Sequence, residues 1–314
     1  MAWTAADIPN LEGRVVVVTG TNTGLGLQSA AALAGAGAHV VMAARTRSKN
    51  EAAQSQILGT NPSASLELVD LDLASQKSIR SAAETIAANH PKIDILLNNA
   101  GLMACPERRT EDGFEMQLGV NHLGPWALTS HLLPNLLRAE AARVVAVTST
   151  ARHMGRAINP DNPNLEGSYE AWKAYGQSKL ANFHFALGLQ RLFRAAGLNA
   201  ASLVAHPGLS DTNLQAVSVE ESEGGLSQRF FHVLAGRTGM TAEAGARPQL
   251  RAATDPNAKG GQLYAPRFAN NGAAVSRPIF RRLGLSSGIA KLWQVSEKMT
   301  GLTVDPAAVA AKLS

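Results

Sequence analysis

Short apolar runs alternate with longer amphipathic stretches over the first two-thirds of the chain. The runs, which predict strands, are residues 15–18, 39–43, 66–71, 93–97, 144–148 and 200–204. The stretches between them, which predict helices, are residues 25–36, 49–58, 76–88, 112–137 and 171–195. Strands that are apolar on both faces belong in parallel sheets covered on both sides. The pattern therefore predicts an α/β fold in which a doubly wound parallel sheet carries helices on both faces.

The chain is expected to form one domain. No low-complexity linker interrupts residues 1–314, and a chain of this length can bury a sizeable core. We therefore predict a single Rossmann-type domain with an N-terminal extension at 1–13 and a C-terminal extension at 268–314. The alternation of runs weakens after His206.

The segment that follows His206 is a candidate substrate loop. Its polar residues 218–225 precede an apolar group made of Phe230, Phe231 and Leu234. We expect the loop at 210–240 to act as a lid, because inserts at the carboxyl ends of strands in such folds face the ligand. The alternative is that these apolar side chains are core contacts of a surface helix.

Composition narrows the class of partner. The formal net charge of +5 suits an anionic ligand, but the basic residues form no long run of the kind that follows nucleic acid. The single cysteine, Cys105, cannot form an internal disulfide and is expected to be a passive thiol. The eight histidines include no pair at metal-ligand spacing, so we predict no metal.

The same sequence lacks the usual targeting signals. Residues 1–10 have no basic start and no long apolar run, and the apolar stretches elsewhere are too short to span a membrane. We expect no transmembrane segment and a cytoplasmic location. The basic pair Arg281 and Arg282 is most simply a solvated face.

A glycine-rich turn joins the first predicted strand to the first predicted helix. At this point the backbone of a dinucleotide-binding unit approaches a pyrophosphate and directs amide N–H groups at it. The alternative is an ordinary turn at a helix start, which the position in a strand–turn–helix unit disfavours. The residues of the turn that we assign to the cofactor are Gly20, Thr21, Asn22, Thr23, Gly24, Leu25 and Gly26.

The end of the second strand predicts which dinucleotide is bound. An acidic residue there would bind the 2′-hydroxyl of NAD(H), but the sequence has Arg45 instead. A guanidinium can clamp a 2′-phosphate, with Arg47 or Lys49 as a second cation. We therefore expect NADP(H) to be preferred over NAD(H), the alternative being a solvated basic loop.

Two residues four positions apart suggest proton chemistry. Tyr175 and Lys179 lie on one face of the predicted helix, where an ammonium next to a phenol would lower the tyrosine pKa. Ser149 ends a predicted strand and can hold a substrate oxygen. Thr148 and Thr150 are alternatives, but their side chains would point to the other face if the strand continued.

The ordered motifs resemble the short-chain dehydrogenase/reductase family. They are the glycine turn at 19–26, Asp72-Leu73, the Asn-Asn-Ala-Gly sequence at 98–101, Asn121, Ser149, the Tyr-x-x-x-Lys sequence at 175–179 and His-Pro-Gly at 206–208. The insert at 152–171 and the sequences at 178–182 and 292–301 resemble the retinol dehydrogenase and protochlorophyllide reductase branch. This branch similarity implies hydrophobic carbonyl or alcohol substrates.

The resemblance also implies a role for each motif residue. Tyr175 would transfer the proton, Ser149 would hold the substrate oxygen, Lys179 would bind the nicotinamide ribose and Asn121 would hold a water of a proton relay. Asp72 would meet the adenine, or alternatively cap the following helix. The other residues implied to contact the cofactor are Leu73, Asn99, Ala100, Gly101, Pro207, Gly208 and Thr212.

The prediction is an oxidoreductase that transfers a hydride between the nicotinamide of NADP(H) and a small hydrophobic carbonyl or alcohol. The alternative from another class is a non-catalytic NADP(H) sensor, which the presence of Ser149, Tyr175 and Lys179 disfavours. A light-driven pigment reductase is disfavoured because no further specific signal supports it. The resemblance leaves a homodimer open, through the helices predicted at 112–137 and 171–195.

Overall fold

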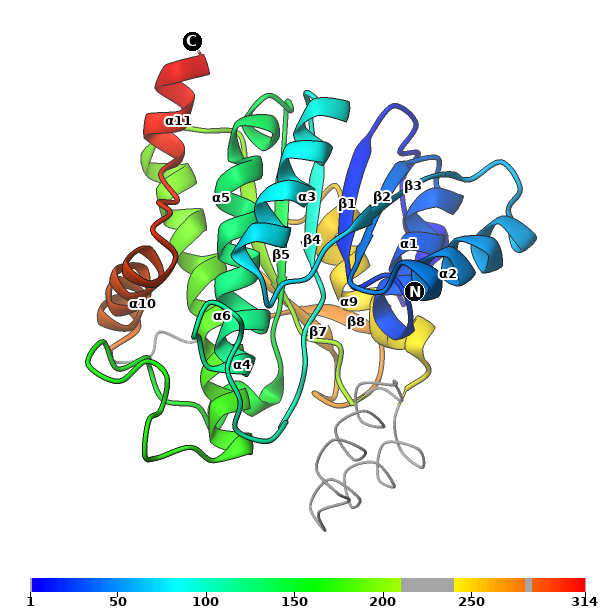
Figure 1. The fold of residues 1–314 in the computed structure, drawn as a ribbon. Helices are drawn as coiled ribbons and strands as arrows, with labels where there is room; N and C mark the ends of the chain where they lie inside the picture. Colours follow the sequence, from blue (N-terminus) through cyan, green and yellow to red (C-terminus); the bar gives the residue numbers. More distant parts are fainter. Residues whose placement is uncertain (1, 210–239, 280–283, 314) are drawn as a thin grey trace.

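The computed structural model describes residues 2–209, 240–279 and 284–313. Its centre is one eight-stranded sheet in the order β3-β2-β1-β4-β5-β6-β7-β8 (Figure 1). Only β8 is antiparallel to its neighbour. The strands are β1 (Val15–Thr19), β2 (His39–Ala44), β3 (Ser65–Asp70), β4 (Ile95–Asn98), β5 (Arg143–Val147), β6 (Ala201–Ala205), β7 (Leu263–Pro266) and β8 (Ala274–Arg277). The predicted doubly wound α/β fold is confirmed.

Helices cover both faces of the sheet (Figure 1). One face packs against α1 (Gly24–Gly35), α2 (Arg47–Thr60) and α9 (Ala242–Thr254). The other face packs against α3 (Gln76–Asn89), α5 (Gly124–Leu137) and α6 (Ala171–Ala195). The short helical segments are η1 (Ala5–Asp7), α4 (Met116–Leu118), η2 (Gly119–Leu123) and η3 (Thr150–His153).

The valine run of β1 shows why the sheet needs two helical layers. Val16 and Val18 are completely buried on the α1 and α9 side, whereas Val17 is completely buried on the α3 and α5 side. Side chains of a strand alternate between faces, so a continuous apolar run must be covered on both. Each fully buried valine stabilises the fold by roughly 1.5–3 kcal/mol relative to an exposed one.

The helix predicted from residue 112 begins later than expected. Glu115 caps its start, because its carboxylate accepts hydrogen bonds from the backbone N–H groups of Gln117 at 2.7 Å and Leu118 at 2.7 Å. The helix is then interrupted by η2, a π-helical turn, before α5 begins at Gly124. Such turns often occur at functional sites, and Asn121 lies in this one.

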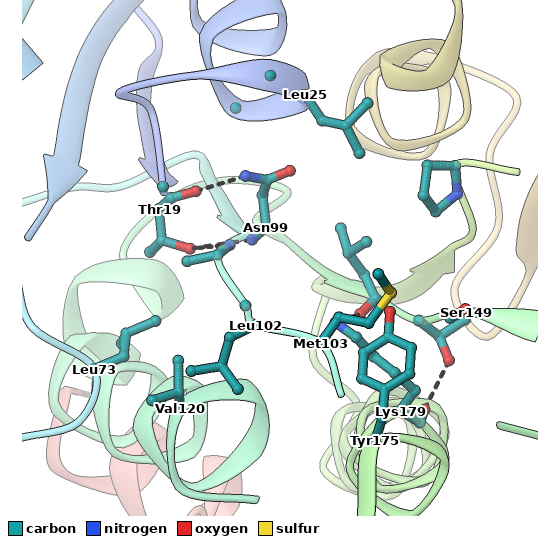
Figure 2. A pocket seen from close by; sticks show the side chains of 18 of the residues that line it. Thr19, Leu25, Leu73, Asn99, Leu102, Met103, Val120, Ser149, Tyr175 and Lys179 are labelled. Carbon is teal, nitrogen blue, oxygen red and sulfur yellow. Dashed lines mark hydrogen bonds between the residues drawn. The ribbon is translucent and has the colours of Figure 1, made fainter. Parts of the chain in front are cut away.

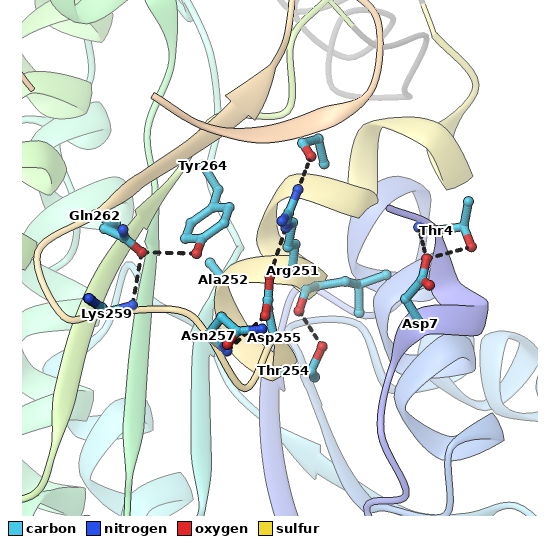
Figure 3. A network of polar contacts seen from close by, with 12 residues as sticks. Thr4, Asp7, Arg251, Ala252, Thr254, Asp255, Asn257, Lys259, Gln262 and Tyr264 are labelled. Carbon is cyan, nitrogen blue, oxygen red and sulfur yellow. Dashed lines mark hydrogen bonds and ion pairs between the residues drawn. The ribbon is translucent and has the colours of Figure 1, made fainter. Parts of the chain in front are cut away.

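The weakened alternation after His206 concealed α9, β7 and β8. β7 is only four residues long, and Pro248 lies inside α9, where a proline disfavours the prediction of a helix. Arg251 ties these elements together. Its Nε lies 2.9 Å from Asp255, its Nη1 donates to the Ala274 carbonyl at 2.6 Å, and its guanidinium lies 5.7 Å from the centre of the Tyr264 ring (Figure 3). The proposed lid residues Phe230, Phe231 and Leu234, like the pair at 281–282, lie outside the described residues.

The C-terminal helices α10 (Leu285–Thr300) and α11 (Pro306–Leu313) pack on α6 and α5. The Trp293 ring stacks on Phe185 at 5.9 Å and meets Trp126 edge-on at 5.0 Å. Gly188 of α6 makes room for it, since a Cβ there would lie 2.2 Å from the indole. The outer face of α5 and α6, which the resemblance implies for pairing, is thus covered by the same chain. Within the described residues, no helix is both long and apolar enough to cross a membrane.

Candidate active site

A cavity of about 580 Å³ opens at the carboxyl ends of the parallel strands. It spans the point where the strand order reverses between β1 and β4, and ligands of doubly wound sheets bind in this crevice. Figure 2 shows the residues around it: Thr19, Leu25 and Asn99 lie on one side, and Ser149, Tyr175 and Lys179 lie on the other. The fold therefore brings the two predicted groups, glycine turn and proton-transfer residues, to one cavity.

The glycine turn is shaped by close backbone contacts. Gly20 has a φ of +74°, and a Cβ there would lie 3.0 Å from Ala100. A Cβ on Gly26 would lie 2.0 Å from the Gly20 carbonyl oxygen. Only glycine fits at both positions, which lets the start of α1 approach the cavity. Thr21 differs from its neighbours, because its buried hydroxyl donates to Asn50 at 2.8 Å instead of lining the cavity.

A hydrogen-bonded chain fixes the glycine turn to the end of β4. The Thr19 hydroxyl accepts from the backbone N–H groups of Asn99 and Ala100 at 3.1 and 3.0 Å, and Asn99 Nδ2 donates to the Thr19 carbonyl at 2.8 Å. Gln249 of α9 donates to Asn99 Oδ1 at 2.9 Å and to the Ser29 hydroxyl at 2.8 Å. Sequence reasoning missed Gln249, because it is 150 positions from Asn99 and belongs to no motif.

The three basic residues after β2 that were predicted to bind a phosphate differ in their contacts. Arg45 is exposed and lines the cavity. Arg47 instead faces its own helix and β3, since its guanidinium contacts Glu51 at 3.0 Å and Asp70 at 3.7 Å. Lys49 lies exposed on α2. Of the three cation candidates, Arg45 is the one that lines the cavity and can meet a ligand group there.

Asp72 and Leu73 also line the cavity. The Asp72 carboxylate accepts from the backbone N–H of Ala74 at 2.9 Å, which holds it in a tight turn. The cap of α3 is Ser75, whose hydroxyl accepts from the backbone N–H of Ser78 at 3.2 Å. The alternative interpretation of Asp72 as the helix cap is therefore wrong.

The proton-transfer residues come from β5 and α6. Ser149 lies two residues after the end of β5, and Tyr175 and Lys179 lie one turn apart on α6. Thr148 is excluded as a substitute for Ser149, because it is buried and its hydroxyl donates to the Lys179 carbonyl at 2.7 Å. This bond holds α6 against the end of β5. Thr150 is exposed at the start of η3.

Burial shifts the pKa values of both α6 groups. The pKa of Tyr175 is raised to about 12 because its phenolate would be desolvated, and a hydrogen bond with Ser149 only partly opposes this. Burial lowers the pKa of Lys179 to about 8. The expectation that Lys179 lowers the tyrosine pKa is therefore wrong: the ammonium is 5.7 Å from the ring centre, and burial raises the pKa of Tyr175.

Asn121 lies behind the cavity wall and is fully buried. Its Nδ2 donates to the Leu102 carbonyl and the Ser178 hydroxyl, each at 2.9 Å, and its Oδ1 accepts from the Leu102 backbone N–H at 2.8 Å. The side chain thus holds the loop after β4 against α6. A Cβ on Gly101 would lie 2.7 Å from Asn121 Oδ1 and 3.2 Å from Lys179 Nζ, so this glycine leaves room for both groups.

Pro207 and Gly208 line the cavity beyond β6. Gly208 has a φ of +78°, and a Cβ there would lie 2.5 Å from the Asn270 carbonyl oxygen. The β7–β8 turn therefore approaches the cavity closely at this point. Thr212, also predicted to contact the cofactor, lies outside the described residues.

The cavity wall near Tyr175 is apolar. Met103, Met154 and Trp172 line it, and the Trp172 ring centre is 6.1 Å from that of Tyr175. Sequence reasoning did not identify these residues, because an isolated methionine or tryptophan carries no motif. Cys105, considered as an edge of this pocket, is 1% exposed, and its carbonyl accepts a hydrogen bond from the Tyr169 hydroxyl at 2.7 Å. It is part of the core.

Comparisons with known proteins identify the family of this chain. A family model described as short chain dehydrogenase matches residues 14–223. Retinol dehydrogenase 14 of Homo sapiens is 35% identical over 308 residues, which cover 93% of this chain and 88% of that protein. The predicted resemblance to the retinol dehydrogenase branch is confirmed.

Two solved structures share the fold. An uncharacterized protein from Mycobacterium paratuberculosis is 39% identical, with a TM-score of 0.78 over 96% of this chain and 99% of that chain. A protein from Beutenbergia cavernae that is described as an NAD(P)-dependent gluconate 5-dehydrogenase, with NADP bound at low occupancy, is 26% identical. Its TM-score is 0.63 over 81% of this chain and 95% of that chain.

Proposed function

Since this chain belongs to the short-chain dehydrogenase family, and is therefore a dehydrogenase or reductase, we propose that it uses NADP(H) to interconvert hydrophobic carbonyls and alcohols. The observation that carries the proposal is the single cavity that joins Arg45 and the glycine turn at one end to Ser149, Tyr175 and Lys179 at the other. Its volume of about 580 Å³ is within the usual range of ligand-binding cavities.

The residues present fit a dinucleotide. The missing side chains of Gly20 and Gly26 let backbone amides approach a pyrophosphate at the start of α1. Arg45 supports NADP(H) over NAD(H), because its guanidinium stands after β2 where an acidic residue would bind the 2′-hydroxyl of NAD(H). The gluconate dehydrogenase with bound NADP is consistent with this preference.

Ser149, Tyr175 and Lys179 each have a separate role in the transfer of the proton. When bound, the nicotinamide ring supplies or accepts the hydride at the substrate carbon. Ser149 holds the substrate oxygen, and Tyr175 donates its proton to that oxygen during reduction or takes it back during oxidation. With a pKa of about 12, Tyr175 is protonated at neutral pH and ready to act as the acid. Lys179 supplies a buried cation one helical turn away.

The apolar wall supports a hydrophobic substrate. Met103, Met154 and Trp172 offer no charge to a polar ligand, and Met154 is 54% exposed at the rim. Burying apolar substrate surface against them is favourable. The name of the human relative describes action on retinol, and this favours extended apolar aldehydes and alcohols as the first compounds to screen.

Calorimetric titration tests the cofactor part of the proposal. We expect NADPH to bind more tightly than NADH, and Arg45→Ala to weaken NADPH binding roughly tenfold or more with little effect on NADH. Arg47→Ala is the matched control, because Arg47 already has protein partners, and it should keep the preference. Equal affinity for the two nucleotides in the wild type would overturn the NADP(H) assignment.

Turnover of retinaldehyde and other apolar aldehydes with NADPH tests the catalytic part. We expect Tyr175→Phe to bind NADPH normally and to lose reduction. A wild-type protein that binds NADPH but reduces no carbonyl in the screen would support a sensor instead.

A further inference from the structure

Three polar side chains meet at the end of the sheet opposite the cavity. His39 is the first residue of β2, Glu67 lies near the start of β3, and His90 caps the carboxyl end of α3. The cavity lies at the carboxyl ends of the strands, so this cluster is separate from the oxidoreductase site.

The cluster is compact and partly buried. One ligand atom from each residue can be chosen so that all three lie within 4.8 Å of one another. His90 Nε2 is 2.6 Å from Glu67 Oε2, and His39 Nε2 is 3.4 Å from the same oxygen. The two imidazole ring centres are 4.9 Å apart. The exposed fractions of the side chains are 30% for His39, 23% for Glu67 and 13% for His90, which leaves one side open to water.

Neighbouring residues orient these ligand atoms. His39 Nδ1 is 2.7 Å from the Ser65 hydroxyl, and Ser65 is the residue that pairs with His39 in the β2–β3 register. If Nδ1 donates to this hydroxyl, the lone pair of Nε2 faces Glu67 and His90. Asn89 Nδ2 donates to Glu67 Oε1 at 2.8 Å, which leaves Oε2 toward the two imidazoles. Such outer contacts are typical of metal ligands.

We propose that His39, Glu67 and His90 bind one divalent transition-metal ion, with Zn²⁺ as the preferred candidate. Two imidazole nitrogens and one carboxylate oxygen form a ligand set that suits Zn²⁺, and water completes a tetrahedral site from the open side. Tetrahedral ligands about 2.0–2.2 Å from zinc lie roughly 3.4 Å apart. The distance of 3.4 Å between His39 Nε2 and Glu67 Oε2 already matches this value. The distance of 2.6 Å between His90 Nε2 and Glu67 Oε2 would increase when the ion replaces the proton that these two atoms share.

The spacing of these residues explains why the sequence predicted no metal. Glu67 is 28 positions from His39 and 23 positions from His90, which is unlike any local metal-ligand motif. The parallel pairing of β2 with β3 and the end of α3 bring them together. The bound ion would link two strands to a helix end, so it would stabilise this edge of the fold.

The test uses untagged full-length protein, treated with a chelator and then titrated calorimetrically with ZnCl₂. We expect one equivalent to bind, and His39→Gln and Glu67→Gln each to weaken binding at least tenfold. Ser65→Ala should weaken it about tenfold by releasing the His39 ring. His131→Gln, on α5 and half-buried, is the matched control and should bind like the wild type.

Co²⁺ provides a second readout, because its visible absorption changes when imidazole and carboxylate replace water. The same spectrum should be lost in His39→Gln and Glu67→Gln. Melting followed by circular dichroism in excess chelator shows whether each variant is folded. The proposal is overturned by the absence of saturable binding near one equivalent, or by binding that both variants retain. NADPH titration of these variants should be unchanged, so failure of the metal site is distinguishable from failure of the proposed function.

Discussion

The ammonium nitrogen of Lys179 lies 5.7 Å from the centre of the Tyr175 ring, one turn along α6, and both side chains are at least 95% shielded from water. Burial disfavours the charged form of each group, which is the phenolate of Tyr175 and the ammonium of Lys179. It therefore raises the pKa of the tyrosine and lowers the pKa of the lysine. The tyrosine stays protonated to about pH 12, and the lysine gives up its proton near pH 8. Tyr175 is therefore a proton donor at neutral pH.

The pH dependence of turnover should differ between the two directions. Carbonyl reduction needs the protonated form of Tyr175, so its kcat/KM should be nearly flat around neutral pH. Alcohol oxidation needs the phenolate, so its kcat/KM should rise close to tenfold per pH unit until the phenol ionises. Steady-state assays with NADPH and NADP⁺ measure both. Tyr175→Phe should lower both rates by about 100-fold or more. An oxidation rate independent of pH would show that another group accepts the proton.

Replacing Lys179 should stabilise the fold while abolishing activity. The pKa of Lys179 falls from 10.5 to about 8 on folding. Below pH 8 the lysine is charged although it is buried, and this lowers the free energy of unfolding. Lys179→Met removes this cost and should increase the free energy of unfolding at pH 7 by up to about 3 kcal/mol. The stability of the wild type rises from pH 8 to 10.5, so the difference should shrink there. Urea unfolding at pH 7 and 10 checks the sign; a less stable variant at pH 7 would contradict it.

Two glycines of α1 provide a matched pair. Gly26→Ala places a Cβ 2.0 Å from the Gly20 carbonyl oxygen, whereas a Cβ on Gly35 meets nothing within 4 Å. We expect Gly26→Ala to lower NADPH affinity at least tenfold by displacing the turn, and Gly35→Ala to leave it unchanged. Fluorescence titration with NADPH measures both. Similar affinities for the two variants would mean that the close approach at Gly26 does not shape the nucleotide site.

Two buried histidines should make the fold sensitive to acid. Burial lowers the pKa of both His122 and His206 from 6.5 to about 3. The unfolded chain therefore binds two more protons than the folded chain between these values, and stability present above pH 6.5 is lost as the pH falls toward 3. The two sites together contribute about 3 kcal/mol per pH unit.

Urea unfolding between pH 7 and 5 measures this slope. His122→Gln removes one titrating group and should reduce the slope by about half of that contribution, whatever its effect on stability at pH 7 through the lost contact with Ser296. An unchanged slope would show that His122 takes up a proton in the folded state.

The sequence by itself determined the features that depend on local spacing. The valine run of β1 required a sheet covered on both faces, and the glycines at 20, 24 and 26 required a close turn before α1. The four-residue separation of Tyr175 and Lys179 placed them on one face of α6, because a helix repeats every 3.6 residues. These inferences need only the geometry of single elements and the order of motifs.

Tertiary structure decided what depends on distant residues and on burial. Gln249 reaches Asn99 from 150 positions away, and Trp293 fills the space left by Gly188. Burial reversed the expected direction of the Tyr175 pKa shift, because desolvation depends on the whole surrounding core. His39, Glu67 and His90 form a cluster only because the pairing of β2 with β3 and the packing of the end of α3 bring them together. Long-range packing has no periodic signal in a sequence, so only the folded chain reveals it.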